Sequence, residues 1–258
     1  MKLRFAALAL SLTTFAAAAC AQANSFQLIN KGGKAVGKAS YTIDKTKDGY
    51  KVKSKFEYRS GAVVLSDNPD PYGASSDGAN ITDAQVTSEY KVDANGNFIS
   101  GFTQNSANQT LTSFSPSKPR DTVVIAQMQG GVNLGSKSLG MPKPDFLVAP
   151  DYDPSAMQVL LTGALAHPHS DHIYLLAVPA SNPRNANNAL YLTIADPTDA
   201  TGTLDGKPVA LKHYALGWNK AKGDLYADAN GTLMEANIGT IGVRYVRTKF
   251  ALDEAPAQ

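Results

Sequence analysis

The sequence predicts a mainly β protein: a strongly curved antiparallel sheet, of the half-barrel type, wrapped around one central helix. Three observations lead to this prediction. Short segments of alternating apolar and polar residues recur along the chain, turn signals rich in Gly, Asn and Asp separate them, and one stretch alone has the apolar spacing of a helix. Charged residues make up only 18% of the chain, a composition typical of strands joined by polar turns.

The first half of the chain predicts a series of strands. The alternation is clearest over 50–58, where apolar or small residues alternate with charged ones, so one face should be buried and the other wet. Two long Gly- and Pro-rich stretches, 67–83 and 130–144, are expected to be irregular. The expected strands are 25–29, 34–43, 50–58, 86–92, 98–102, 110–114 and 122–128.

A single helix is expected in the middle of the chain. Asp153 provides a cap and Pro154 the first helical position, and the helix should end before Pro168. Between them lies a broad apolar stripe, which predicts that the helix packs on a sheet. Strands should resume after the helix, at 173–178, 190–195, 208–216, 224–227, 233–239 and 243–250.

The amino terminus has the pattern of a secretory signal peptide. Lys2 and Arg4 precede an apolar run, and the stretch ends in two small-x-small sites within 19–23. We therefore expect residues 1–23 to be a signal peptide, residues 24–258 to form a single β-rich domain, and the protein to be periplasmic or secreted. In the alternative, Cys20 is the lipid-modified first residue of a lipoprotein, although Ala17 stands where such bacterial signals usually carry Leu.

Charge and cysteine content restrict the classes of partner. The chain has 24 Lys and Arg against 22 Asp and Glu, and removal of Lys2 and Arg4 would leave 22 against 22. A neutral, well-mixed chain has no basic field for nucleic acid, so we expect no nucleic-acid partner, and no integral membrane segment is expected in the mature chain. Because Cys20 is the only cysteine, no intramolecular disulfide is expected.

The order of elements, together with several local motifs, supports a resemblance. The chain resembles uncharacterised periplasmic half-barrel proteins, which are similar in architecture to the outer-membrane lipoprotein carrier and receptor proteins. The resemblance implies a curved sheet around a helix or an apolar cavity, and a non-catalytic module that binds or carries a hydrophobic small molecule, an envelope lipid or a lipoprotein. It supplies no catalytic residue. The motifs that carry it are 26–41 with Gly37, Gly49-Tyr50, Gly231-Thr232-Leu233 and 243–247.

One short segment, 167–172, points to different chemistry. It reads His-Pro-His-Ser-Asp-His and matches the H-x-H-x-D-H metal-binding signature of the metallo-β-lactamase fold hydrolases. In that fold the signature follows a strand and leads into a helix, whereas here the predicted helix comes first. The chain contains only four histidines, three in this segment plus His213, which is too few for a complete di-zinc site.

A site for one zinc ion requires less. His167, His169 and Asp171 could supply three ligands, and His172 or His213 could supply the fourth, which would give a mononuclear zinc-binding protein or a hydrolase with a metal-activated water. In the alternative, Pro168 ends the helix and the imidazoles are simply solvated. The sequence also permits an envelope protein with neither ligand nor metal.

Overall fold

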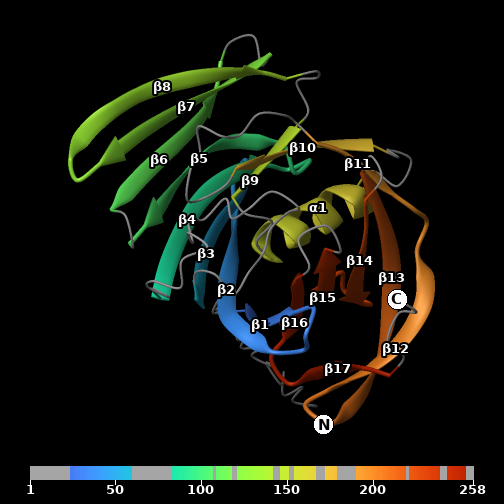
Figure 1. The fold of residues 1–258 in the computed structure, drawn as a ribbon. Coiled ribbons are helices and arrows are strands. Elements are labelled where there is room, and N and C mark those ends of the chain that lie inside the picture. Colours follow the sequence, from blue (N-terminus) through green and yellow to red (C-terminus); the bar gives the residue numbers. More distant parts are fainter. Residues whose placement is uncertain are drawn as a thin grey trace, which may run out of the picture.

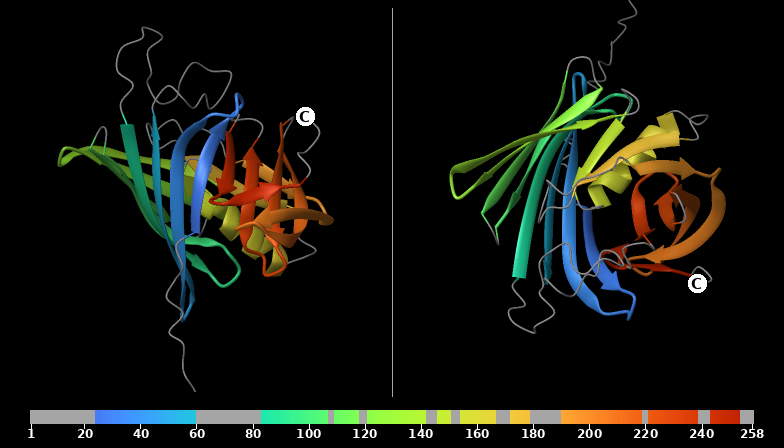
Figure 2. Two further views of the ribbon diagram at one scale, coloured as in Figure 1. Left: turned by 90° about the horizontal axis from the view of Figure 1, so that it is seen from below. Right: turned by 45° about the horizontal axis from the view of Figure 1, so that its top comes forward.

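The computed structural model describes residues 24–59, 83–106, 109–117, 121–141, 146–150, 154–166, 172–178, 190–218, 221–238 and 243–253. These residues form one large, open, curved sheet and one helix, which confirms the predicted fold class. The sheet is antiparallel except for one parallel pair, β9 with β10. Figures 1 and 2 show a broad wall of strands on one side of the helix and a tighter curl of strands on the other.

The broad wall is an antiparallel meander in which each strand pairs with the next along the chain. We call strands β2 to β8 the wing. Strand β1 pairs with β2 on one side and with β16 on the other, and so joins the wing to the rest of the sheet. The strands are β1 (Asn24–Asn30), β2 (Ala35–Thr46), β3 (Gly49–Arg59), β4 (Asp83–Asp93), β5 (Phe98–Asn105), β6 (Thr110–Pro116), β7 (Thr122–Gln129) and β8 (Val132–Gly140).

The second half of the sheet is more tightly curved. Strands β13, β14, β15 and β16 are antiparallel neighbours, and β17 returns to pair with β12, which itself pairs with β13. We call β12 to β17 the ring; it is completed between β16 and β17 by a turn of the chain rather than by a ladder (Figure 2). Its strands are β12 (Thr198–Leu204), β13 (Lys207–Trp218), β14 (Ala221–Asp228), β15 (Leu233–Ile238), β16 (Val243–Arg247) and β17 (Phe250–Leu252).

Three further strands lead from the helix into the ring. Strand β9 (Phe146–Pro150) pairs in parallel with β10 (His172–Val178), because the helix lies between them in the chain and provides the crossover. Strand β11 (Leu190–Ile194) pairs with β10 and then with the end of β13.

The helix α1 spans Pro154–Ala166, as the sequence predicts. It lies between the inner face of the wing and the outer face of the ring (Figure 1). Its described residues are almost all buried, so α1 is the centre of the main core, to which both halves of the sheet contribute. Examples of its members are Val52, Tyr90 and Ile125 from the wing, Leu160 and Leu161 from α1, and Leu225, Leu233 and Ile238 from the ring.

One side chain of the helix ties the two halves together. Gln158 Oε1 accepts hydrogen bonds from the Tyr41 hydroxyl in the wing (3.0 Å) and from the Leu233 amide in the ring (2.7 Å). Its Nε2 donates to the Gly231 carbonyl oxygen (2.8 Å). The hydroxyls of Ser155 and Tyr90 add a further link between α1 and the wing (2.7 Å). A buried amide with three partners therefore fixes α1 against both halves.

The stretch 130–144, predicted to be irregular, instead contains a strand. Residues Val132–Gly140 form β8, which pairs with β7 along its length. Gly130 and Gly131 have φ of 54° and 84° and form the β7–β8 turn, while Gly135 (φ 93°) follows a register shift and donates its N–H to Asn133 Oδ1 (2.8 Å). The glycines therefore mark a hairpin and a bulge rather than a loop.

Three smaller differences concern strands that periodicity did not reveal. Strands β9 and β12 were not expected, and the single strand expected over 243–250 is divided into β16 and β17. The division falls at Lys249, whose φ of 64° breaks the strand. Strand β12 has the sequence TDATGTL, with few apolar residues, and it forms because β13 and β17 supply its partners. The loop expected over 67–83 and the signal peptide expected over 1–23 lie outside the described residues, except for Asp83.

Candidate functional site

The residues predicted to bind zinc are only partly described. His167, His169 and Asp171 lie outside the described residues, and of His172 only the backbone, at the start of β10, is described. The helix α1 ends at Ala166 and β10 begins at His172, so the segment follows a helix and leads into a strand, as the sequence predicts. This order is the reverse of that in the metallo-β-lactamase fold, and the structure gives that resemblance no support.

The strand register places His213 away from His172. His172 lies opposite Thr193, Thr193 lies opposite Gly217, and His213 is four residues from Gly217 along β13. With about 4.8 Å per strand and about 3.3 Å per residue, the two histidine Cα atoms are about 16 Å apart. Among the described residues, no group of His, Cys, Asp and Glu could hold a metal ion. The zinc site remains a prediction for the segment 167–172.

His213 belongs to a polar cluster on the inner face of the ring. Its Nε2 lies 2.8 Å from Asp224 Oδ1 on β14, and its ring stacks on Tyr226 with centroids 4.7 Å apart and planes 13° apart. His213 and Asp224 keep 27% and 26% of their side-chain surface exposed, so solvent reaches this part of the ring. Strand alternation puts these side chains on the face opposite to α1, because the intervening residue Leu225 is in the main core.

The cluster continues onto β15 and β16 with a buried ion pair. Glu235 is opposite Tyr226, is 1% exposed, and has Oε1 3.3 Å from Arg244 Nε. The two atoms are in contact but are not aligned for a hydrogen bond, so neither has a hydrogen-bond partner. Asn237 lies between Asp224 and Arg244 in the ladder. We call these six residues the mouth cluster: His213, Asp224, Tyr226, Glu235, Asn237 and Arg244.

Burial shifts two protonation equilibria in the mouth cluster. Burial raises the pKa of the Glu235 carboxyl, Arg244 opposes the rise, and the charge of Asp224 adds to it. Burial, with the nearby charges of Asp224 and Glu235, raises the pKa of Tyr226 to about 12. Tyr226 is therefore a neutral hydroxyl at physiological pH, and the cluster combines ionised, neutral and aromatic groups.

A hydroxyl adjoins the His213–Asp224 pair. The Thr198 hydroxyl lies 3.4 Å from His213 Nδ1, so hydroxyl, imidazole and carboxylate follow one another in the order of a catalytic triad. That distance is longer than the roughly 2.6–3.2 Å of a tight contact between a nucleophile and its base, and such contacts are often longer without substrate. The order of the three groups alone assigns no reaction to the cluster.

The apolar floor of the ring lies below the mouth cluster. The side chains there form a second core, separate from the main one, and they fill the ring around β17. The ring is thus packed with apolar groups at one end and lined with polar groups at the other. The floor consists of Leu211, Met234, Val246 and Phe250, and Tyr226 of the mouth cluster packs against them.

The inner face of the wing is the second candidate surface. Side chains directly opposite one another across the strands form parallel rows on this face. One row is apolar and lies next to the helix end that Tyr90 contacts: Val52, Tyr90, Gly101, Phe114 and Ile125. The neighbouring row is polar and uncharged, and we call it the polar row: Ser88, Thr103, Thr112 and Gln127.

The polar row changes the expectation of an apolar concave face. All four residues are buried, with exposures of 5%, 4%, 1% and 7%. None of their polar atoms is among the sealed side-chain atoms without a partner in the described residues, so the hydroxyls and the amide are either hydrogen-bonded or reached by solvent. The row therefore brings hydroxyl and amide groups, which both donate and accept hydrogen bonds, to a face that is otherwise apolar. The inner face of the wing is therefore amphipathic.

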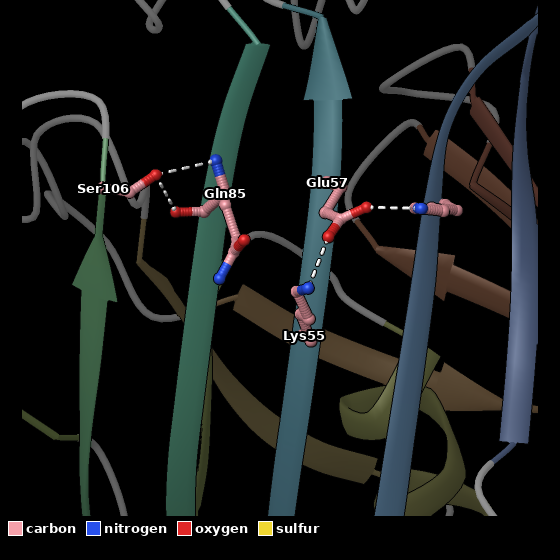
Figure 3. A network of polar contacts seen from close by, with 5 residues as sticks. Lys55, Glu57, Gln85 and Ser106 are labelled. Carbon is pink, nitrogen blue, oxygen red and sulfur yellow. Dashed lines mark hydrogen bonds and ion pairs between the residues drawn. The ribbon is translucent and has the colours of Figure 1, made fainter.

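A third surface feature is a groove on the outer face of β1 to β3, with a volume of about 380 Å³. Two lysines and one glutamate line it (Figure 3): Glu57 accepts from Lys38 Nζ (2.8 Å) and from Lys55 Nζ (2.5 Å). Both hydrogen bonds lower the pKa of the Glu57 carboxyl, and the bond from Lys38 has the larger effect. On the neighbouring strand the Ser106 hydroxyl and the Gln85 backbone exchange hydrogen bonds of 3.1 and 3.2 Å. The groove is open and its charges are already paired, so it is a weaker candidate.

Comparison with known proteins supports the fold and goes no further. No family model and no curated protein matches this chain. A solved structure from Brucella abortus, described as a β-barrel-like protein of the domain of unknown function DUF1849, is similar over 90% of this chain and 97% of its own, with 12% identity and a TM-score of 0.50. A DUF1089 family protein from Pseudomonas aeruginosa is more distantly similar, over 76% of this chain and 87% of its own, with 12% identity and a TM-score of 0.43.

The β-barrel-like protein agrees with the resemblance to uncharacterised barrel-like proteins. Among the described residues, no helix has the length and hydrophobicity needed for a membrane crossing. Sequence reasoning missed both the mouth cluster and the polar row. The row had a signal, since Ser88, Thr103 and Thr112 occupy inward positions of alternating strands, but the cluster depends on cross-strand register alone.

Proposed function

We propose that this protein is an exported, non-catalytic envelope module that binds a hydrophobic ligand or an envelope lipid or lipoprotein on the inner face of the wing. The observation that carries the proposal is the amphipathic inner face, where an apolar row runs beside the polar row across β4 to β7. Because the apolar row is buried in the main core, an acyl chain or similar group would lie along it only when the packing against this face of the wing opens. A neutral polar part of the same ligand would meet the hydroxyls and the amide.

Among the described residues, the inner face of the wing buries no charged side chain, which favours a ligand that is amphipathic but uncharged. The polar residues buried in the wing are Ser, Thr, Asn and Gln, and none is ionisable. Hydroxyl and amide groups exchange hydrogen bonds with water or a ligand without the large desolvation cost of a charge. A pocket with mostly apolar walls and a few polar groups is the usual form of a small-molecule site.

Export is part of the proposal and rests on the sequence. The segment 1–23 has the three-part organisation of a signal peptide. Mass spectrometry of the protein recovered from the periplasmic fraction would give the first residue. A first residue after Ala21 or Ala23 supports the signal peptide, a diacylated Cys20 supports the lipoprotein alternative, and an intact Met1 in the cytosol contradicts export.

A fluorescence titration tests ligand binding directly. The apolar probe N-phenylnaphthylamine should bind the purified full chain saturably, and a monoacylglycerol below its critical concentration should displace it. Thr112→Arg, which places a charge in the polar row, should weaken binding at least tenfold. Ser113→Arg is the matched control, because Ser113 is the next residue on β6 and is exposed on the outer face.

A second variant protects the test against misfolding. Thr112→Val keeps the shape of the side chain and removes only its hydroxyl, so the protein should still fold. It should bind the apolar probe as tightly or more tightly and the monoacylglycerol more weakly. Absence of saturable binding in the folded wild type, or equal loss in Thr112→Arg and Ser113→Arg, would reject the wing as the binding surface.

A further inference from the structure

The exposed large apolar side chains of this protein gather on one part of the wing. Six such side chains are exposed among the described residues, and all six lie on β5 to β8. Single exposed apolar side chains are normal on a protein surface, whereas a group of them marks a contact with a partner or a membrane. The six are Ile99, Phe102, Leu111, Met128, Val132 and Leu134.

Three of the six are neighbours on the outer face of the wing. Each is next in sequence to a buried residue of the polar row, so strand alternation turns its side chain outward. Leu111 is opposite Met128, and Phe102 lies diagonally beside Leu111, since it is opposite Ser113. The other described elements, the helix included, lie on the opposite side of these strands (Figure 2). We call Phe102, Leu111 and Met128 the outer patch.

The strands that carry the outer patch contain no acidic residue. The one charged residue on β5 to β8 is Lys137. Its partner in the ladder, Ile125, belongs to the main core, so Lys137 lies at the edge of the inner face. On the outer face of these four strands the apolar side chains are therefore surrounded by uncharged residues, and an anionic partner would meet no like charge there.

Lysines border the outer patch on the strands next to β5. Lys53 is opposite Glu89 and Glu89 is opposite Phe102, while Lys91, two residues along β4, lies on the same face. Lys53 and Lys91 are exposed, and neither takes part in an ion pair within the described residues. Glu89 is held by Lys51 at 2.7 Å and keeps only 29% of its side-chain surface. The outermost charges beside the patch are therefore positive.

The outer patch is too small for a stable contact between two copies of the chain. Its three side chains are 40%, 38% and 42% exposed. At about 200 Å² for a large apolar side chain they offer roughly 240 Å² of apolar surface, well below the roughly 800 Å² per partner of a standard protein interface. A bilayer makes no such demand, because a few apolar side chains enter the boundary between headgroups and acyl chains while lysines bind the phosphates above them.

We infer that the outer face of the wing attaches the protein to the surface of an anionic phospholipid bilayer. The outer patch enters the boundary of the acyl chains, and Lys53 and Lys91 lie among the headgroup phosphates. The attachment uses the face of the wing opposite to the proposed ligand surface, so it does not depend on the proposed function.

Vesicle sedimentation with the purified full chain tests the attachment. Vesicles of equal parts phosphatidylcholine and phosphatidylglycerol should retain the protein at low ionic strength, and vesicles of phosphatidylcholine alone should retain it at least tenfold more weakly. Lys53→Glu/Lys91→Glu should weaken partitioning onto the anionic vesicles at least tenfold. Lys207→Glu/Lys222→Glu changes two exposed lysines of the ring, has the same net charge, and should partition like the wild type.

Tryptophan fluorescence identifies the face that meets the lipid. Phe102→Trp should be quenched by vesicles that contain brominated phosphatidylglycerol, whereas Ala210→Trp, at an exposed position on β13, should not. Thr112→Arg, which blocks the inner face of the wing, should still bind the anionic vesicles. Failure of the ligand surface and failure of the attachment are therefore distinguishable.

Three results overturn the inference. One is no retention of the folded wild type by the anionic vesicles, and another is equal loss of partitioning in the two charge-reversal variants. The third is a dimer in analytical ultracentrifugation that Phe102→Ser/Met128→Ser abolishes, because the outer patch would then be an interface between copies of the chain.

Discussion

The wing and the ring bury polar side chains in different ways. Both are curved antiparallel sheets, and α1 packs against both. The buried polar residues of the wing are all uncharged, whereas the one buried charged residue in the described part of the chain is Glu235, in the ring. The uncharged set in the wing is Ser54, Ser88, Thr103, Asn105, Thr110, Thr112 and Gln127.

The difference follows from the free energy of burying a neutral polar group compared with that of burying a charged group. A hydroxyl or amide on a buried face costs at most about 1–3 kcal/mol even where it lacks a partner, so a sheet can carry several such groups. A buried carboxylate costs several kcal/mol unless a cation lies beside it, and Arg244, on the neighbouring strand β16, lies 3.3 Å from Glu235. In the described residues the wing therefore buries only neutral polar groups, whereas the ring buries a charge together with its counter-ion.

Removing apolar volume from the helix should have the largest effect, because both halves pack on it. Leu161 is fully buried in the main core, so Leu161→Ala should lower the free energy of unfolding by about 2–5 kcal/mol. Leu111→Ala, on the outer face of the wing and 38% exposed, should change it by less than about 0.5 kcal/mol. Urea denaturation measures both, and equal losses would show that α1 is not the shared core.

Cutting the polar link between the halves should have the next largest effect. Gln158→Leu leaves the Tyr41 hydroxyl, the Leu233 amide and the Gly231 carbonyl without their partner, and should cost about 2–4 kcal/mol. The amide of Leu233 should exchange faster with solvent, which hydrogen-exchange mass spectrometry detects. Gln104→Leu on the exposed face of β5 is the control and should leave that exchange unchanged.

Disturbing the β12–β17 pairing should weaken the ring but not the wing. A Cβ at Gly202 would lie 2.7 Å from the Ala251 carbonyl oxygen and 2.9 Å from a ring carbon of Phe250. Gly202→Ala should therefore cost about 1–3 kcal/mol and expose the apolar floor. Gly140→Ala, on β8, meets nothing within 4 Å and should be close to neutral. Faster hydrogen exchange confined to β12 and β17 would support the prediction that only the ring is weakened. A loss of protection in both the ring and the wing would contradict it.

The smallest effect is a pH dependence that belongs to the ring. Burial raises the pKa of Glu235 in the folded state above its unfolded value of about 4.3. The protonated form is thus favoured by folding, and its contribution to stability is present at low pH and lost as the pH rises through the folded pKa. Relative to Glu235→Gln, the wild type should become less stable as the pH rises from about 4.5 to 8. The measurement is the free energy of unfolding of both proteins as a function of pH. If the two curves are parallel from about pH 4.5 to 8, the raised pKa of Glu235 is contradicted.

The sequence predicted the helix and most strands of the wing, but it did not predict strands with few buried apolar residues. Period-two alternation identified the strands of the wing because one face of each is buried, and the Asp-Pro start identified α1. It failed for β8 and β12, which have few buried apolar residues and form because a neighbouring strand supplies hydrogen bonds. It also led to an apolar concave face, because Ser and Thr at inward positions give no hydrophobic signal.

By itself, the sequence determined the β-rich class, the single helix in the described residues and the helix-then-strand order around the segment 167–172, because these depend on local patterns. Only the tertiary structure decided which side chains meet. Glu235 and Arg244 are nine residues apart, and His213 and Asp224 eleven, yet each pair is in contact because antiparallel register brings neighbouring strands within about 5 Å. The polar row spans forty residues for the same reason, since a row across a sheet has no period along the chain.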